Sequence, residues 1–210
     1  LRDVRDGASF ALGHPLLRPV FLTQAVFNGA FFVLQAVYVP YAVDHLGLTA
    51  SEVGLTLAAY GAGMLAGATM AGPVIRALPF GIVIVAGPLA GVAAALAMVL
   101  TVWAPSMWLA AVAFFLIGVG PILWVIATMT LRQTVTPGDL LGRVSAVFTT
   151  ATGARPLGAA LGALVGARYG AEACLVVAAV GFVAQAMIIL ASPVPRLANQ
   201  PARADGPRSG

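Results

Sequence analysis

Six long apolar stretches, separated by short polar segments, make up most of the sequence. A transmembrane α-helix needs about 20 consecutive apolar residues, because the hydrocarbon core of a bilayer is about 30 Å thick. Each stretch meets this length, so the pattern predicts an all-α, polytopic membrane protein with one transmembrane bundle over residues 20–191. The predicted spans are 20–43, 53–75, 82–102, 106–130, 144–167 and 171–191.

Residues at the start of the second span favour this helix boundary. Thr49 and Ser51 are candidate N-caps, because a hydroxyl can accept a hydrogen bond from the unpaired N–H groups of a first helical turn. Glu52 adds a negative charge to that turn, where the helix dipole favours it. The second span is therefore expected to start close to these residues.

The loop before the fifth span has a similar pattern. Thr136, followed by Pro137 and Asp139, is expected to start the helix that carries this span. Asp139 and Arg143 are four residues apart, a spacing at which opposite charges pair on a helix. The segment predicts either this ion pair or a helix start with no further role.

The arginines predict the orientation in the membrane. The segment before the first span, the loops after the second and fourth spans, and the tail together hold Arg2, Arg5, Arg18, Arg76, Arg132, Arg143, Arg196, Arg203 and Arg208. The other three loops hold only Arg168. Because cytoplasmic loops collect arginine and lysine, both termini are expected in the cytoplasm of a cell-membrane protein. Residues 1–19 are then a cytoplasmic linker and residues 192–210 a disordered cytoplasmic tail.

The first span has a polar stripe along one face. At 100° per residue, an arc of about 80° holds four polar residues, with Phe31 in its middle. They are Gln24, Asn28, Gln35 and Tyr38. The stripe predicts a face that lines a water-accessible substrate cavity. The alternative is hydrogen bonding between packed helices, worth about 0.6 kcal/mol per contact.

The second and fourth spans have weaker versions of such a face. In the second span it holds Thr56, Tyr60, Gly63 and Gly67, and in the fourth it holds Pro121, Trp124 and Thr128, preceded by Gly118 and Gly120. Trp124 and Thr128 are candidate cavity residues. A proline inside a helix removes a backbone hydrogen bond, so the glycine and proline residues are candidates for helix packing or gating. The alternative is a purely structural proline.

The third and sixth spans are almost free of polar side chains. Thr101 ends the third span, and Gln185 is the main polar residue of the sixth. A helix surrounded by lipid has no use for amides, so both spans are expected to be peripheral.

Arg155 lies near the middle of the fifth span. Insertion of an arginine at this depth costs about 2.5–3.5 kcal/mol, so the span is expected to lie inside a bundle. Every acid lies in a loop, a tail or the first turn of a span, at Asp3, Asp6, Asp44, Glu52, Asp139, Glu172 and Asp205. Arg155 is therefore expected either to line the cavity or to reach the surface or the carbonyls beside Pro156. Proton coupling needs a titratable group at depth, so the chain is not expected to supply it alone.

The same span has a regular spacing of small residues. Gly158, Gly162 and Gly166 follow Arg155 on its side of the helix. Such a Gly-x-x-x-Gly pattern lets a neighbouring backbone approach closely. These glycines and Pro156 are predicted to act in packing or gating.

The composition excludes a soluble domain and disfavours an enzyme. Hydrophobic residues make up 60% of the chain and charged residues 9%, with a mean hydropathy of +0.99. No run of arginines is dense enough for nucleic acid, and one cysteine and two separated histidines predict neither a metal site nor a cofactor.

Several short motifs resemble the C-terminal six helices of major facilitator superfamily transporters, in the branch that includes the enterobactin exporter and macrolide-efflux-like permeases. The motifs are Arg5-Asp6-Gly7, His14-Pro15-Leu16-Leu17-Arg18, Leu131-Arg132-Gln133, Pro137, Gly142-Arg143-Val144 and Arg155-Pro156-Leu157-Gly158. In the loop over residues 72–81, only Gly72 and Arg76 match the superfamily's cytoplasmic motif. Arg76, Asp139 and Arg143 are therefore candidate cytoplasmic loop residues, and a conformational latch in the 72–81 loop is not expected.

The resemblance implies a cavity between two six-helix halves and transport by alternating access. This chain would be the C-terminal half of an exporter of drug-like or siderophore-like molecules, with the bilayer, a small-molecule substrate and an N-terminal half as partners. Each half would be a three-plus-three inverted repeat. A faint internal alignment, of Gly61, Ala62 and Leu65 with Gly153, Ala154 and Leu157 and of Arg76 with Arg168, agrees with this. The alternative is a truncated six-helix protein that self-assembles as a scaffold without transport.

Overall fold

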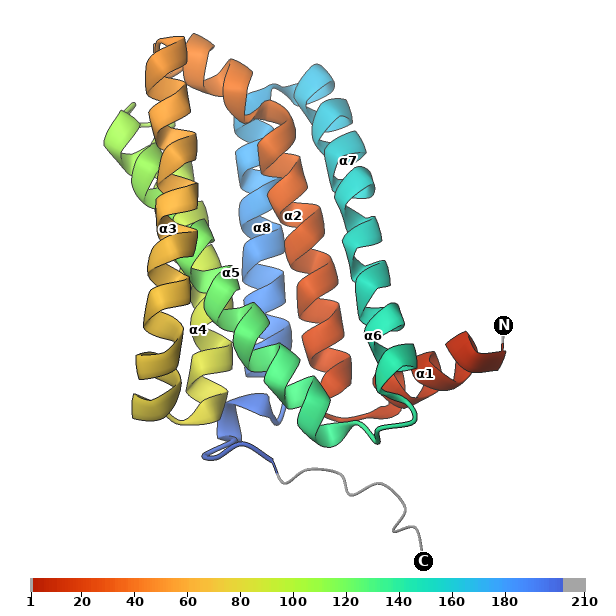
Figure 1. Cartoon of the computed structure of the whole chain (residues 1–210). Helices are drawn as coiled ribbons and strands as arrows, with labels where there is room; N and C mark the ends of the chain where they lie inside the picture. Colours follow the sequence, from red (N-terminus) through yellow and green to blue (C-terminus); the bar gives the residue numbers. More distant parts are fainter. Residues whose placement is uncertain (1, 202–210) are drawn as a thin grey trace, which may run out of the picture.

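The computed structural model describes residues 2–201, and every regular element in this range is a helix (Figure 1). The α-helices are α1 (Arg2–Gly13), α2 (Leu17–Asp44), α3 (Ala50–Ala77), α4 (Phe80–Leu100), α5 (Met107–Val135), α6 (Leu141–Thr150), α7 (Ala154–Tyr169) and α8 (Ala171–Leu190). Two 3-10 turns are η1 (Ala151–Gly153) and η2 (Val194–Arg196). Within residues 2–201, five helices are long and apolar enough to cross a membrane, namely α2, α3, α4, α5 and α8.

These five helices coincide with the predicted spans to within a few residues. The start of α3 shows why. Thr49 is its N-cap and accepts a hydrogen bond from the Glu52 N–H at 3.4 Å, while the Glu52 carboxylate accepts one from the Thr49 N–H at 2.8 Å. This reciprocal capping box fixes the boundary, as the sequence predicted for Thr49.

The predicted fifth span is not one continuous helix. The chain over residues 144–167 runs through α6, η1 and α7, which follow one another along the bundle (Figure 1). Two features explain the break. Pro156 has no N–H for the Thr152 carbonyl, and the hydroxyls of Thr150 and Thr152 donate to main-chain carbonyls three residues earlier, at 2.7 and 2.6 Å.

The segment before α6 also differs from expectation. Thr136 ends α5 as its C-cap instead of starting the next helix, and α6 begins at Leu141. Among the described residues, Arg143 pairs with Asp6 of α1 at 3.9 Å. The predicted linker over residues 1–19 is partly helical, because it contains α1, and α1 packs against α6.

The tail is ordered further than predicted. Val194 is fully buried, and the N–H groups of Gly81 and Phe80 donate to the carbonyls of Leu197 and Ala198 at 2.8 and 3.3 Å. The first N–H groups of a helix lack partners within it, so this segment caps α4. The prediction of disorder is wrong for residues 192–198, and its remaining part from 202 onward lies outside the described residues.

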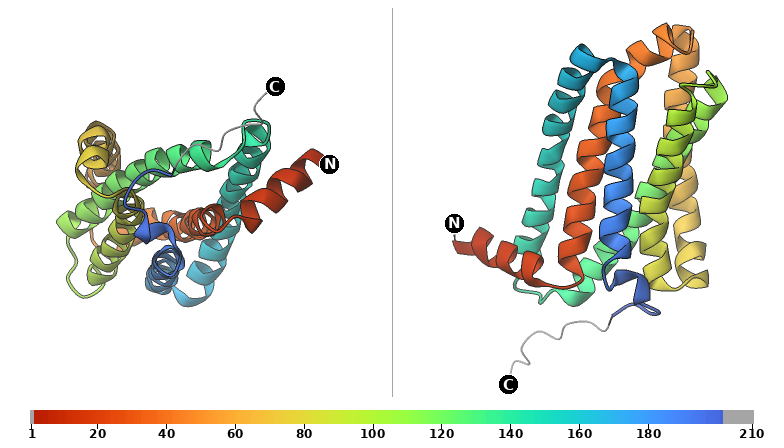
Figure 2. Two further views of the ribbon diagram at one scale, coloured as in Figure 1. Left: turned by 90° about the horizontal axis from the view of Figure 1, so that it is seen from below. Right: turned by 180° about the vertical axis from the view of Figure 1, so that it is seen from behind.

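The long helices form two groups of three. In one group α5 packs on α3 and α4, and in the other α2 packs on α7 and α8; contacts between α4 and α8 join them. Figure 2 shows the same arrangement from below and from behind. Both described ends of the chain lie at one end of the bundle, called here the terminal face, and the other end is called the opposite face (Figure 1).

Close approach of the backbones depends on several of the predicted glycines. A Cβ at Gly63 would meet the backbone of Phe115, and one at Gly67 would lie 2.8 Å from the Val119 carbonyl oxygen, so both glycines seat α3 on α5. Gly158, Gly162 and Gly166 likewise seat α7 on α2, and Gly120 seats α5 on α4. Larger residues would force these helices apart.

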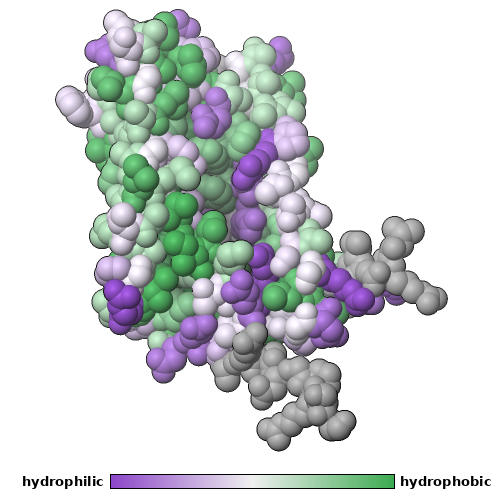
Figure 3. Space-filling view, in the orientation of Figure 1, coloured by the Kyte–Doolittle hydropathy of each residue, from purple (hydrophilic) through white to green (hydrophobic). Residues whose placement is uncertain are grey.

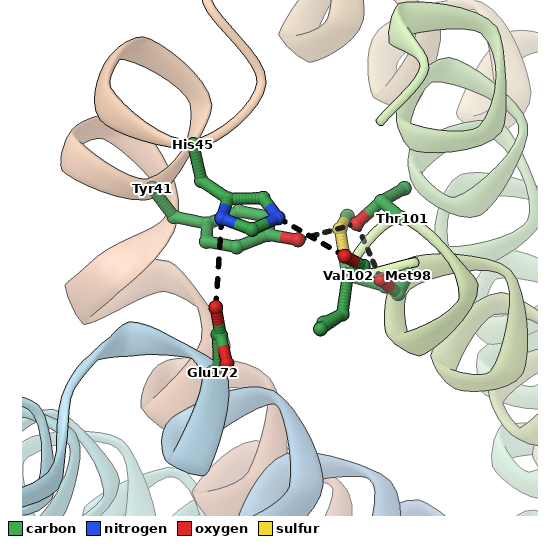
Figure 4. A network of polar contacts seen from close by, with 6 residues as sticks. All are labelled: Tyr41, His45, Met98, Thr101, Val102 and Glu172. Atoms are coloured by element: carbon green, nitrogen blue, oxygen red, sulfur yellow. Dashed lines mark hydrogen bonds and ion pairs between the residues drawn. The ribbon is translucent and has the colours of Figure 1, made fainter. Parts of the chain in front are cut away.

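A polar network closes the opposite face (Figure 4). The Tyr41 hydroxyl lies 2.8 Å from that of Thr101, and the His45 ring lies 3.3 Å from the Val102 carbonyl oxygen and 3.5 Å from the Glu172 carboxylate. The network connects the ends of α2, α4 and α8. His45 therefore contributes to packing at this end of the bundle.

Candidate functional site

A cavity of about 210 Å³ lies at mid-height in the bundle. Side chains from α2, α3, α4, α5, α7 and α8 line it. One buried apolar cluster, with Tyr38 and Phe114, lies on its opposite-face side, and another, with Phe80 and Phe148, lies on its terminal-face side. On the side seen in Figure 3, hydrophilic residues form a band between apolar flanks.

Arg155 stands at the mouth of this cavity, held by an amide rather than by an acid. Its Nε donates to the Asn28 Oδ1 at 2.8 Å, and its guanidinium lies 5.6 Å from the centre of the Phe32 ring. The residue is exposed. Because a neutral amide partner leaves the positive charge uncompensated, the guanidinium can still bind an anion.

Asn28 is itself held in place. Its Nδ2 donates to the main-chain carbonyl of Gln24 at 2.9 Å, and the Gln24 Nε2 donates weakly to the Phe148 carbonyl at 3.5 Å. The Asn28 bond lies within α2, the Gln24 bond connects α2 to α6, and the Arg155 bond connects α2 to α7. Gln24 and Asn28 of α2 thus contact the helices on both sides of η1, where the fifth predicted span is interrupted.

Aromatic rings form the apolar wall. Phe27 and Phe31 stack with centroids 5.8 Å apart, and Phe31 stacks on Tyr60 at 5.9 Å, so α2 and α3 share one surface. Trp124 of α5 lines the cavity from another side. Stacked rings and an exposed cation suit a ligand with both an apolar body and a negative group.

The structure brings together four of the seven predicted cavity residues. Gln24, Asn28, Trp124 and Arg155 line the cavity. Gln35, Tyr38 and Thr128 do not.

Each of these three side chains has another environment. Gln35 is exposed away from the cavity. Tyr38 is fully buried, where its hydroxyl bonds to that of Thr56 and its ring packs edge-on against Phe114 at 4.4 Å. The Thr128 hydroxyl donates to the Trp124 carbonyl of its own helix at 2.7 Å.

The expectation that the third and sixth spans are peripheral is incomplete. Gly87 and Pro88 of α4, and Gln185 of α8, also line the cavity. The sequence contained the signal, because Gln185 is the main polar residue in an otherwise apolar span. Among residues 2–201, no group of three or more His, Cys, Asp or Glu side chains could hold a metal ion.

Residues 16–209 match the sequence family described as the Major Facilitator Superfamily. The chain belongs to this family. Two solved structures with the same fold are of a mutant of the peptide transporter POT. The complex with alafosfalin has a TM-score of 0.69 and 21% identity, over 98% of this chain and 45% of that chain. The complex with sulfate has a TM-score of 0.72 and 21% identity, over 92% and 42%.

This major facilitator chain therefore spans less than half the length of the transporters that it resembles. No curated protein sequence matches it at a significant level. The family match supports a membrane transporter and not an enzyme.

Proposed function

We propose that this chain is the C-terminal half of a secondary-active transporter that exports amphipathic small molecules across the cell membrane by alternating access. In this proposal α6, η1 and α7 together form the fifth of six spans, and the halves of the chain form the three-plus-three inverted repeat. The terminal face, which carries Arg18, Arg76 and Arg132, is cytoplasmic under the positive-inside rule.

The observation that carries the proposal is the environment of Arg155. An arginine at mid-membrane depth costs free energy, and a structural arginine would be expected to have an acidic partner. Arg155 has Asn28, an aromatic ring and an open cavity instead. A transported anion would supply the missing charge only while it is bound, which suits a site that must also release its substrate.

The cavity lining also restricts the class of substrate. In the described part of the chain, the residues that line it include rings and aliphatic groups, one arginine, and no Asp, Glu or His. A zwitterionic peptide would leave its amino group without an acidic partner in this half. An amphipathic anion fits the lining better, and a coupling proton would have to be carried by the other half.

Exposed apolar side chains on α3 and α7 support a second half. Leu65 is 72% exposed on α3, and Leu157 and Leu164 are 72% and 69% exposed on α7. We propose that an N-terminal six-helix half packs beside these helices and closes the cavity, with the bilayer covering the remaining apolar surface.

The test is flux through liposomes that contain the full-length transporter. The probes are fluorescent amphipathic dyes of negative, neutral and positive charge, with and without a pH gradient. Wild type is expected to move the anionic dye, Arg155→Ala to lose this flux at unchanged expression, and Arg155→Lys to keep part of it. Arg168→Ala, which removes an arginine at the opposite face, is the matched control.

Two results would contradict the proposal. Equal flux in wild type and Arg155→Ala would exclude Arg155 from the transport site. Absence of flux for every dye, with the protein assembling as a stable homo-oligomer, would favour the self-assembling scaffold instead.

A further inference from the structure

We propose that Gln185 is a second substrate-binding residue, which donates a hydrogen bond to a neutral oxygen of the substrate inside the cavity. This inference rests on the proposed function and deepens it. Arg155 would bind the anionic group of the substrate, and Gln185 would recognise a carbonyl or ether oxygen elsewhere on the same molecule.

The main observation is an unpaired donor. Gln185 is 1% exposed, and its Nε2 has no hydrogen-bond partner among the described residues. A buried donor without a partner is unfavourable, because it has given up its hydrogen bonds to water without gaining a replacement. A side chain chosen only for packing would avoid that cost, since leucine or methionine would fill the same space.

The neighbours of Gln185 leave its amide available. The nearby Thr23 hydroxyl donates to the main-chain carbonyl of Gln185 at 3.4 Å, so it does not use the side chain. On the α4 side, a Cβ at Gly91 would lie 2.8 Å from the Nε2, so the glycine provides the space that the amide occupies. Both Thr23 and Gln185 line the cavity.

The amide can reach a ligand without rearrangement of the helix. The last side-chain torsion of glutamine is broad and roughly two-fold, so the N–H can turn toward the cavity while the rest of the side chain stays in its rotamer. A substrate oxygen would then give the donor the hydrogen bond that no described residue supplies.

The resulting substrate class is more specific than an amphipathic anion. Arg155 comes from α7 and Gln185 from α8, and Phe27 and Trp124 line the same cavity. The chemistry that fits is a negative group, an apolar or aromatic body, and a neutral oxygen acceptor.

The test compares two series of small anions. One is para-acyl benzoates of increasing acyl length, and the other is para-alkyl benzoates of the same size that lack the carbonyl. Their dissociation constants are measured by calorimetry on the full-length transporter in lipid nanodiscs, with empty nanodiscs subtracted. The variants are Gln185→Met, Gly91→Ala, Arg155→Gln and the control Gln133→Met, which replaces an exposed glutamine of α5.

The inference predicts that, at one acyl length, wild type and Gln133→Met bind the acyl compound about fivefold more tightly than its alkyl partner. Gln185→Met should abolish this preference, Gly91→Ala should reduce it, and Arg155→Gln should weaken both compounds equally.

Three outcomes would overturn it. Equal affinity for the acyl and alkyl compounds of every pair would exclude Gln185, and so would a preference for the acyl compound that survives in Gln185→Met. In either case, weaker binding in Arg155→Gln would leave the proposed function standing. If no benzoate binds, the inference also fails, and the dye flux assay decides the transporter proposal separately.

Discussion

The contact between α3 and α5 gives a prediction about stability that needs no knowledge of the substrate. Gly63 is buried where the two helices meet, and a methyl group there would overlap the Phe115 carbonyl oxygen and lie 3.2 Å from the Gly118 Cα. These are backbone atoms, so they cannot rotate away. Gly63→Ala is therefore expected to push α3 outward.

The change in the free energy of unfolding of Gly63→Ala is the sum of two opposing contributions. Overpacking of this kind costs about 1–3 kcal/mol, while alanine in place of glycine gains up to about 1 kcal/mol in helix propensity. Gly61 is the matched control, because it lies on the same helix, is exposed, and would have nothing within 4 Å of its Cβ. Gly61→Ala should be neutral or slightly stabilising.

The assay is unfolding by sodium dodecyl sulfate in mixed micelles, followed by circular dichroism. The Gly63→Ala midpoint is expected clearly below wild type, and the Gly61→Ala midpoint at or above it. Flux should fall in Gly63→Ala as well, because Tyr60 and Met64 line the cavity from this helix. Equal midpoints for the two variants would refute the packing that we describe.

Three further predictions concern other parts of the chain. Asn28→Leu frees the Arg155 Nε and is expected to lower flux of the anionic dye about tenfold, with a larger effect on KM than on kcat; unchanged flux would exclude a positioning role. Burial lowers the pKa of His14, whose Nδ1 accepts the Leu16 N–H at 3.2 Å. The unfolded chain therefore takes up the proton first as pH falls through about 6.5, and stability is lost on acidification. A lower protection factor of the Leu16 amide at low pH, taken relative to its intrinsic exchange rate and absent in His14→Asn, would show this. A protection factor that does not change with pH would oppose it. Ending the chain after Ala191 should speed exchange of the Gly81 amide, whereas ending it after Asn199 should not, since only the first removes the Leu197 carbonyl; equal exchange in both would contradict the cap.

The sequence predicted the long helices well because the length of an apolar stretch is the dominant signal for a membrane-spanning helix. Five spans needed only their length and apolar composition, and Thr49 fixed a boundary through a local hydrogen bond. The break at η1 was harder to foresee. A proline and several threonines can be tolerated in a transmembrane helix, and their combined effect depends on which carbonyls they leave free or capture.

The candidate site was predicted only in part, because helical periodicity gives a face but not a depth. The stripe from Gln24 to Tyr38 is about 21 Å long at 1.5 Å per residue, so one end lines the cavity while Tyr38 packs in the apolar cluster beyond it. The partner of Arg155 was missed for a similar reason. Asn28 and Arg155 lie far apart in the sequence, and only the packing of α7 on α2 brings them together.

The most direct test of the account is a reversal of charge at Arg155. If this side chain selects the anionic group of the substrate, Arg155→Glu should lose flux of the anionic dye and gain relative preference for the cationic one, at unchanged expression and folding. An unchanged order of dye fluxes in Arg155→Glu would contradict the claim that the cavity beside Arg155 is the transport site.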